Sequence, residues 1–141
     1  MIFDDMSPIE HLSHEAAWAL LTSETVGRLA VSVGKQPDIF PLNYIGHDGK
    51  VYFRTAEGTK LLELTVNANV AFEADGYDAT SAWSVVVIGT AAAIETQSKI
   101  DILNGLPLHP FAPTLKYVWV EITPTELRGR SFEMGPEPER Y

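Results

Sequence analysis

One stretch of the sequence combines side chains that could hold a phosphate group. Residues 53–61 read FRTAEGTKL, which predicts the end of a strand, a short loop and the start of a helix. Arg54 and Lys60 supply two cations, and Thr55 and Thr59 supply two hydroxyls. A helix that begins near Thr59 would add free backbone N–H groups and the positive end of its dipole. This combination predicts a phosphate-binding site.

The spacing of these residues does not match the common phosphate-binding loops. It is neither G-x-x-x-x-G-K-[ST] nor G-x-G-x-x-G. A plainer interpretation of the same residues also stays open. In that interpretation Thr59 only caps the helix, and Arg54 and Lys60 are solvated charges of the strand and the helix.

The charge balance limits the kinds of partner. The chain has 141 residues, with 10 Lys and Arg against 19 Asp and Glu, and a formal net charge of −9. We expect neither nucleic acid nor an anionic membrane as a partner, because both attract basic surfaces. Any site for an anion must gather the few cations in one place. The length predicts one domain over residues 1–141, with a loose lead-in at 1–12 and a loose tail at 133–141.

Residue types that are absent exclude further chemistry. The sequence has no cysteine, which excludes disulfides, thiolate metal sites and cysteine nucleophiles. The four histidines lack the i, i+4 spacing of a zinc-peptidase helix, so we expect no metal site. The acidic first residues do not resemble a secretory signal, and no apolar run reaches the ~18 residues of a membrane span. We therefore expect a cytoplasmic protein.

The elements that must position the candidate site are short strands and small helices. Strands are expected at 27–33, 39–45, 51–55, 70–74, 83–95 and 115–122, and helices at 15–25, 60–66 and 97–103. Asp48-Gly49 predicts a tight hairpin turn, and Gly89 predicts a bulge or a close approach of two backbones. Evenly spaced short strands predict a mainly β fold, an antiparallel β-barrel with short α-helices.

Several motifs follow one another in an order that resembles a known family. They are PLNY at 41–44, DG at 48–49, FRTAEGTKL at 53–61, N-x-x-V-A-F-E at 67–73 and WSVVV-x-G at 83–89. Together they are similar to the flavin-binding split-barrel family, which is the pyridoxamine 5′-phosphate oxidase-like superfamily. The resemblance covers about residues 10–123. The branch that the chain resembles most contains small proteins related to 5-nitroimidazole-resistance reductases.

This resemblance implies a homodimer of split β-barrels with FMN in a groove between the subunits. The residues that would contact the cofactor are Asn43, Tyr44, Phe53, Arg54, Thr55, Thr59, Lys60, Leu61, Trp83 and Ser84. Among them Arg54, Thr55, Thr59 and Lys60 would hold the phosphate. These are the residues that the side-chain chemistry alone singles out.

The remaining cofactor residues would surround the isoalloxazine ring. The resemblance places Asn43 and Tyr44 beside the ring and Phe53 nearby, while Trp83 and Ser84 would complete the pocket from the neighbouring subunit. A neutral amide such as Asn43 suits a flavin, because the ring edge needs donors and an acceptor rather than a full charge.

The C-terminal region departs from the family pattern. True pyridoxamine phosphate oxidases are longer and end with an Arg/His pair for the substrate phosphate. Here residues 127–132 read LRGRSF, and no histidine follows His109. We therefore do not expect that enzyme's substrate. Arg128 and Arg130 either reach toward the cofactor or a substrate anion, or they are solvent-exposed charges.

The function that the resemblance implies is a flavin-dependent oxidoreductase. It would use FMN, a reduced nicotinamide or another small electron donor, and a small planar acceptor. Two alternatives stay open: a reductase that uses the deazaflavin coenzyme, and a non-catalytic flavin or haem binding protein. No acid–base catalytic set stands out in the sequence, which a flavoprotein tolerates because the cofactor carries the redox chemistry. Trp119 is expected in the core rather than stacked on a substrate.

Overall fold

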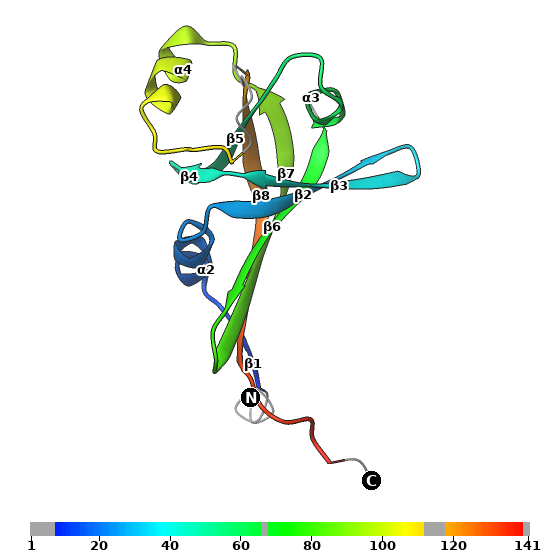
Figure 1. The fold of residues 1–141 in the computed structure, drawn as a ribbon, viewed down its shortest axis with the longest axis vertical. Helices are drawn as coiled ribbons and strands as arrows, with labels where there is room; N and C mark the ends of the chain where they lie inside the picture. Colours follow the sequence, from blue (N-terminus) through cyan, green and yellow to red (C-terminus); the bar gives the residue numbers. More distant parts are fainter. Residues whose placement is uncertain (1–7, 66–67, 112–117, 140–141) are drawn as a thin grey trace.

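The fold is one antiparallel sheet with three short helices (Figure 1). The computed structural model describes residues 8–65, 68–111 and 118–139. Its elements are β1 (Ile9–His11), α2 (His14–Leu21), β2 (Val26–Val33), β3 (Gln36–Asn43), β4 (Ile45–His47), β5 (Lys50–Thr55), α3 (Lys60–Thr65), β6 (Asn69–Tyr77), β7 (Ser81–Ala93), α4 (Gln97–Asn104) and β8 (Val118–Glu133). The strand order is β3-β2-β6-β7-β8-β5-β4, with β1 paired to β8. This confirms the expected mainly β, antiparallel split-barrel fold.

Turn and cap residues behave as their types predict. Asp48 and Gly49 both have positive φ, 51° and 75°, which is what a tight hairpin between β4 and β5 requires. Ser13 caps α2 by accepting a hydrogen bond from the Ala16 N–H at 3.1 Å. The helix ends at Leu21, earlier than expected: the hydroxyl of the C-cap residue Thr22 bonds the Trp18 and Ala19 carbonyls of the last turn, and β2 begins at Val26. None of the described helices is long and apolar enough to cross a membrane.

Two strands extend well past their predicted ends. β8 continues to Glu133 and β6 continues to Tyr77, because each pairs along the 13-residue strand β7. A register shift follows Ile88, where Gly89 meets Pro124 of β8. A Cβ on Gly89 would lie 2.3 Å from the Thr123 carbonyl oxygen, so the expected close approach at this glycine is confirmed. The start of the strand expected at 115–122 and the end of the helix expected at 60–66 lie outside the described residues.

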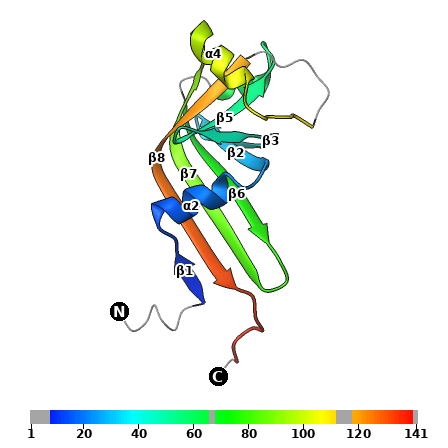
Figure 2. The ribbon, with the colours of Figure 1, turned by 90° about the vertical axis from the view of Figure 1, so that its left-hand side faces the viewer.

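Strand β5 separates two apolar cores. Because neighbouring strand residues point to opposite faces, Val51 and Phe53 lie in the main core under α2, with both residues 0% exposed. The other face of β5 carries Tyr52 and Arg54 toward α4. There a second apolar cluster, which we call the α4 cluster, contains the buried residues Tyr52, Leu103, Leu108 and Trp119. Figures 1 and 2 show α4 at the end of the sheet opposite to β1.

Candidate functional site

The two threonines of the predicted phosphate site lie side by side. Their Oγ1 atoms are 3.0 Å apart, although Thr55 ends β5 and Thr59 precedes α3. Thr59 donates to the Ala56 carbonyl at 2.9 Å and accepts the Leu62 N–H at 3.2 Å. Thr59 therefore caps α3, as the plainer interpretation had it. The structure brings the predicted pair together, but its hydroxyls are engaged with each other and with the loop.

Lys60 is the exposed cation of this region. Its side chain is 72% exposed, and its Nζ lies 3.2 Å from Oδ2 of Asp38 on β3. Exposed ion pairs of this kind contribute little stability, so the ammonium can exchange Asp38 for another anion at low cost. The neighbouring Leu61 is partly buried and packs against the main core. Lys60 is thus accessible, whereas Leu61 mainly anchors the helix.

Arg54 is a half-buried cation on the other face of β5. Its Nη2 donates to the Leu108 carbonyl at 3.0 Å, and its guanidinium carbon lies 5.1 Å from the centre of the Trp119 ring. Among the described residues, its buried Nε has no hydrogen-bond partner, and none of their carboxylates lies within ion-pair distance of it. A guanidinium has five N–H donors. Arg54 therefore keeps donors and charge that an anion could use.

Arg54 and Thr55 are adjacent, so their side chains leave β5 on opposite faces. Strand β4 pairs with β5 only as far as Tyr52, whereas β8 pairs with β5 through Thr55. The end of β5 thus has one edge that β4 does not cover. An anion that lies across this edge could meet Arg54 from one face and Thr59 and Lys60 from the other.

The residues expected beside the flavin ring separate into surface and core. Asn43 is half-buried, and its Oδ1 accepts the Phe111 N–H at 2.8 Å. Tyr44 is only 2% exposed; its hydroxyl donates to the Leu21 carbonyl, and its ring meets Phe72 edge-on at 4.7 Å. Burial raises the pKa of the Tyr44 hydroxyl above its ordinary value. Tyr44 and the fully buried Phe53 therefore present no side-chain surface to a ligand in this chain.

Trp83 and Ser84 lie far from Arg54 within one chain. Arg54 pairs with Trp119 of β8, whereas Ser84 pairs with Arg130 of the same strand. These two β8 positions are separated by roughly 35 Å of strand. A groove of about 1040 Å³ opens beside Arg130, between β1 and the end of β8. Within one chain, the residues predicted for a single pocket therefore lie in two separate places.

Comparison with known proteins gives the same fold and family. A family model described as pyridoxamine 5′-phosphate oxidase matches residues 13–131. The chain belongs to the pyridoxamine 5′-phosphate oxidase family.

Solved structures resemble this family member over most of its length. A Corynebacterium glutamicum protein assigned to the pyridoxamine 5′-phosphate oxidases has 42% identity and a TM-score of 0.85, covering 93% of this chain and 98% of that one. A FAD binding protein from Mycobacterium smegmatis has 38% identity and a TM-score of 0.79, covering 88% and 98%. A protein from Bacteroides thetaiotaomicron that is assigned to 5-nitroimidazole antibiotic resistance shares the fold, with 11% identity and a TM-score of 0.71, and the match covers 90% of each chain.

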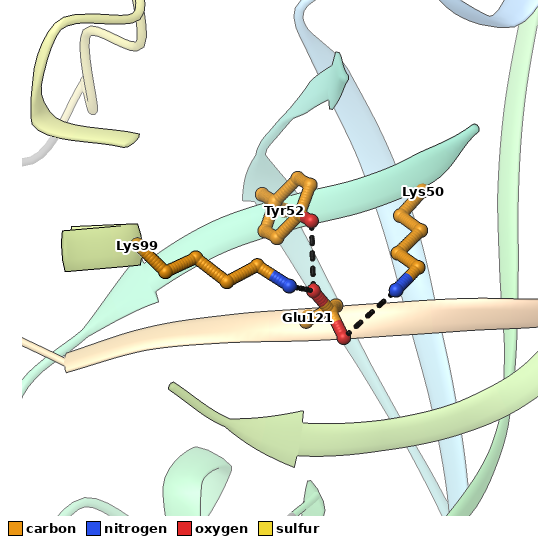
Figure 3. Close-up of polar contacts among 4 residues, drawn as sticks. All are labelled: Lys50, Tyr52, Lys99 and Glu121. Atoms are coloured by element: carbon orange, nitrogen blue, oxygen red, sulfur yellow. Dashed lines mark hydrogen bonds and ion pairs between the residues drawn. The ribbon is translucent and has the colours of Figure 1, made fainter. Parts of the chain in front are cut away.

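A buried carboxylate in this family member was missed by sequence reasoning. Glu121 of β8 has a side chain that is 11% exposed and accepts the Tyr52 hydroxyl at 2.7 Å (Figure 3). Lys99 of α4 contacts the same oxygen, and Lys50 lies 3.5 Å from the other. Burial alone would raise the pKa of Glu121, but the bonds from Lys99 and Tyr52 and the charge of Lys50 hold the pKa below its ordinary value. The sequence did hold one signal for this role: Glu121 and Trp119 are two positions apart and so share one face of the strand.

A second charged cluster joins β2 and β6. Arg28 Nε lies 3.3 Å from Glu73 Oε1, and Arg28 Nη2 lies 2.6 Å from Asp75 Oδ1. Burial, followed by the neighbouring Asp75, raises the pKa of Glu73 to about 7. Glu73 and Asp75 are two positions apart on β6 and so share one strand face, and Arg28 is the cation between them.

The two C-terminal arginines have different surroundings. Arg128 is exposed and pairs with Glu126 at 3.0 Å, which fits the interpretation as a solvated charge. Arg130 lines the groove beside β1, where it stands opposite His11. Arg130 therefore lies beside a cavity that could take a ligand.

Proposed function

We propose that this protein binds a flavin nucleotide, FMN in the first place, and uses it to transfer electrons from a small donor to a small planar acceptor. Its family membership and the similarity to a FAD binding protein at 38% identity support a flavin as ligand. The observation that carries the assignment in this chain is Arg54, a half-buried cation with an unsatisfied Nε and no carboxylate partner among the described residues. An anionic ligand would satisfy it.

In this proposal each predicted residue has a distinct task. Arg54 and Lys60 bind the ribityl phosphate across the uncovered edge of β5, with Thr55 and Thr59 beside it. Asn43 offers its remaining amide N–H to the ring edge, because its Oδ1 accepts from Phe111 and its Nδ2 already donates once, to the Thr25 carbonyl. The bound flavin supplies hydride and electron transfer, which no side chain of the protein can provide. Tyr44 and Phe53 support the site from the core rather than by direct side-chain contact.

We further propose that the pocket is completed by a second copy of the chain. The part of the pocket near Trp83, Ser84 and Arg130 is too far from Arg54 to serve the same ligand within one subunit. The sheet also has a face suited to pairing. Val86 and Ile88 of β7 alternate with the buried Val85 and Val87, so they point away from the main core and stay partly exposed. A two-fold dimer through this face would join the two parts.

The test is the affinity of purified protein for FMN and for riboflavin, which lacks the phosphate. Arg54→Ala and Lys60→Ala are expected to weaken FMN binding by about tenfold or more, the range for one charge-assisted contact, and to leave riboflavin binding nearly unchanged. Glu15→Ala, at an exposed position of α2, serves as the control. Protein that stays colourless and gains no thermal stability with FMN contradicts the proposal. Equal losses for both ligands contradict the phosphate assignment alone.

The choice among cofactors needs a parallel titration. FMN, FAD and the deazaflavin coenzyme should be compared side by side, because the similar Mycobacterium smegmatis protein is named for FAD. The deazaflavin coenzyme carries a long polyanionic tail, whereas the whole chain has only 10 Lys and Arg. We therefore consider the deazaflavin coenzyme a weaker candidate than FMN or FAD.

Turnover separates an enzyme from a carrier. Bound flavin that is reduced by a nicotinamide coenzyme and reoxidised by a quinone or nitro compound supports the oxidoreductase. Flavin or haem that binds without such turnover supports the non-catalytic alternative. Sedimentation of the purified protein tests the dimer.

A further inference from the structure

We propose that Glu121 is a positioning residue for Arg54, acting through α4 and the segment that follows it. This inference rests on the proposed phosphate-binding role of Arg54. We call residues 97–111 the α4 cap. Glu121 fixes the α4 cap on β5 and β8, and the cap in turn holds the Arg54 guanidinium in the orientation that meets the phosphate.

The first step links Glu121 to α4. Lys99 of α4, Tyr52 of β5 and Lys50 of β5 all converge on the Glu121 carboxylate, as Figure 3 shows. The Lys99 ammonium also lies 5.8 Å from the centre of the Tyr52 ring. Glu121 therefore joins strand β5, strand β8 and helix α4 at one point. A buried carboxylate with three donors is costly to disturb, because each partner would lose its acceptor.

The second step links the α4 cap to Trp119. Asn104 Oδ1, at the end of α4, accepts the Trp119 indole N–H at 2.8 Å. Leu103 and Leu108 are 1% and 5% exposed and pack with Tyr52 and Trp119 in the α4 cluster. In addition to the Glu121 cluster, the α4 cap therefore contacts the sheet through the Asn104–Trp119 hydrogen bond and through the apolar packing of the α4 cluster.

The third step links the α4 cap to the candidate site. The Leu108 carbonyl accepts from Arg54 at 3.0 Å, and the Trp119 ring lies under the Arg54 guanidinium. Three residues later, the Phe111 N–H donates to Asn43 at 2.8 Å. The cap therefore touches two of the predicted cofactor residues. Among the described residues, Leu108 and Trp119 are the partners that orient Arg54, and both belong to the structure that Glu121 ties together.

Charge and position predict opposite effects when Glu121 is neutralised. Removing a negative charge near a phosphate site would, by Coulomb attraction alone, tighten FMN binding. Loosening the α4 cap would instead let Arg54 turn away and weaken FMN binding. The sign of the change therefore distinguishes a positioning role from a simple electrostatic one.

The experiment compares Glu121→Gln with the wild type by titrating FMN and riboflavin against flavin fluorescence. We expect FMN affinity to fall about tenfold, within the range of couplings between contacting groups, and riboflavin affinity to change less than about twofold. In an Arg54→Gln background, Glu121→Gln should cause no further loss. Tighter FMN binding, equal loss for both flavins, or additive losses with Arg54→Gln would overturn the inference.

Two further measurements keep the test informative. Lys99→Gln disturbs only the 37% exposed end of the cluster, so it should fold and reproduce the FMN-specific loss. Glu15→Gln on the exposed side of α2 is the matched surface control and should change neither affinity. Hydrogen exchange needs no flavin: in Glu121→Gln, exchange should rise at Phe111 and along residues 105–111. Unchanged exchange there overturns the positioning role by itself, whereas wild-type protein that binds no flavin overturns the proposed function.

Discussion

Two charged clusters on this sheet have opposite compositions. At Glu121, one carboxylate faces two ammonium groups and a phenol beneath α4. At Arg28, one guanidinium faces the two carboxylates of Glu73 and Asp75 on strands β2 and β6. The first arrangement lowers the pKa of its glutamate, and the second raises the pKa of Glu73 to about 7. Burial opposes ionisation at both glutamates: the donors around Glu121 outweigh it, whereas at Glu73 the neighbouring Asp75 adds to it and Arg28 does not outweigh it. Asp75 itself has a lowered pKa despite burial, because Glu73 and Arg28 both hydrogen-bond to it.

The clusters should also differ in how much they contribute to stability. Glu121→Ala leaves three donors without their acceptor, and we expect a loss of about 2–3 kcal/mol in the free energy of unfolding. This is below the usual cost of opening a buried pair, because Lys50 and Lys99 can turn to water. Glu73→Ala leaves Arg28 paired with Asp75, so we expect less than about 1 kcal/mol. Urea denaturation at neutral pH measures both. Similar losses for the two variants would contradict the difference in burial.

The cations sharpen the same comparison. Arg28→Met removes the single cation between two carboxylates, and we expect a loss of about 1 kcal/mol at neutral pH. Lys99→Met leaves Glu121 with Lys50 and Tyr52, so its effect on stability should be smaller, at most about 0.5 kcal/mol. Melting of both variants at matched pH tests this order. A larger loss of stability in Lys99→Met than in Arg28→Met would contradict the view that the number of cations in each cluster sets the effect of removing one.

The smallest effect is a pair of opposite pH dependences. The pKa of Glu121 is depressed in the folded state, so its contribution is complete above about 4.5 and disappears as the pH falls through the folded pKa. The pKa of Glu73 is raised from 4.5 to about 7, so its contribution is complete below 4.5 and disappears as the pH rises to about 7.

Stability measured against pH checks these signs. Glu73→Gln should flatten the profile between 4.5 and 7 by less than about 1 kcal/mol, because solvent screens this half-exposed group. Glu121→Gln should instead remove part of the loss below 4.5. A Glu73→Gln profile that steepens toward neutral pH would show that the sign for Glu73 is wrong.

Most of the fold could be predicted from the sequence because local signals decide it. The alternation of Leu29 and Val31 located β2, and Asp48-Gly49 located the hairpin before β5. The lower half of β8 could not be predicted, since residues 123–133 are mainly polar and lack an alternating apolar pattern. These residues become a strand because β7 offers them a pairing edge, which is a long-range property.

The sequence predicted the chemical kinds of residue at the candidate site better than it predicted where their side chains lie. Thr55 and Thr59 do meet, as their spacing around a loop suggested. Tyr44 and Phe53 lie in the core, which motif matching does not reveal because it locates residues along the chain and not on a face. Glu121 was missed because its role depends on α4, a helix some 20 residues away that covers an otherwise solvent-facing strand position.

The register shift between β7 and β8 at Gly89 fixes the number of residues in this part of β8 more strictly than it fixes their types. After the shift, each β8 residue from Glu126 to Glu133 pairs with one residue of β7. This register places Gly129 against Ala17 of α2, where an added Cβ would lie 2.6 Å from the Ala17 Cβ. Inserting or deleting one residue between positions 125 and 128 would bring Arg128 or Arg130 to that place and exchange the two faces of the strand. Insertions should be tolerated at the β2–β3 turn and not in this segment.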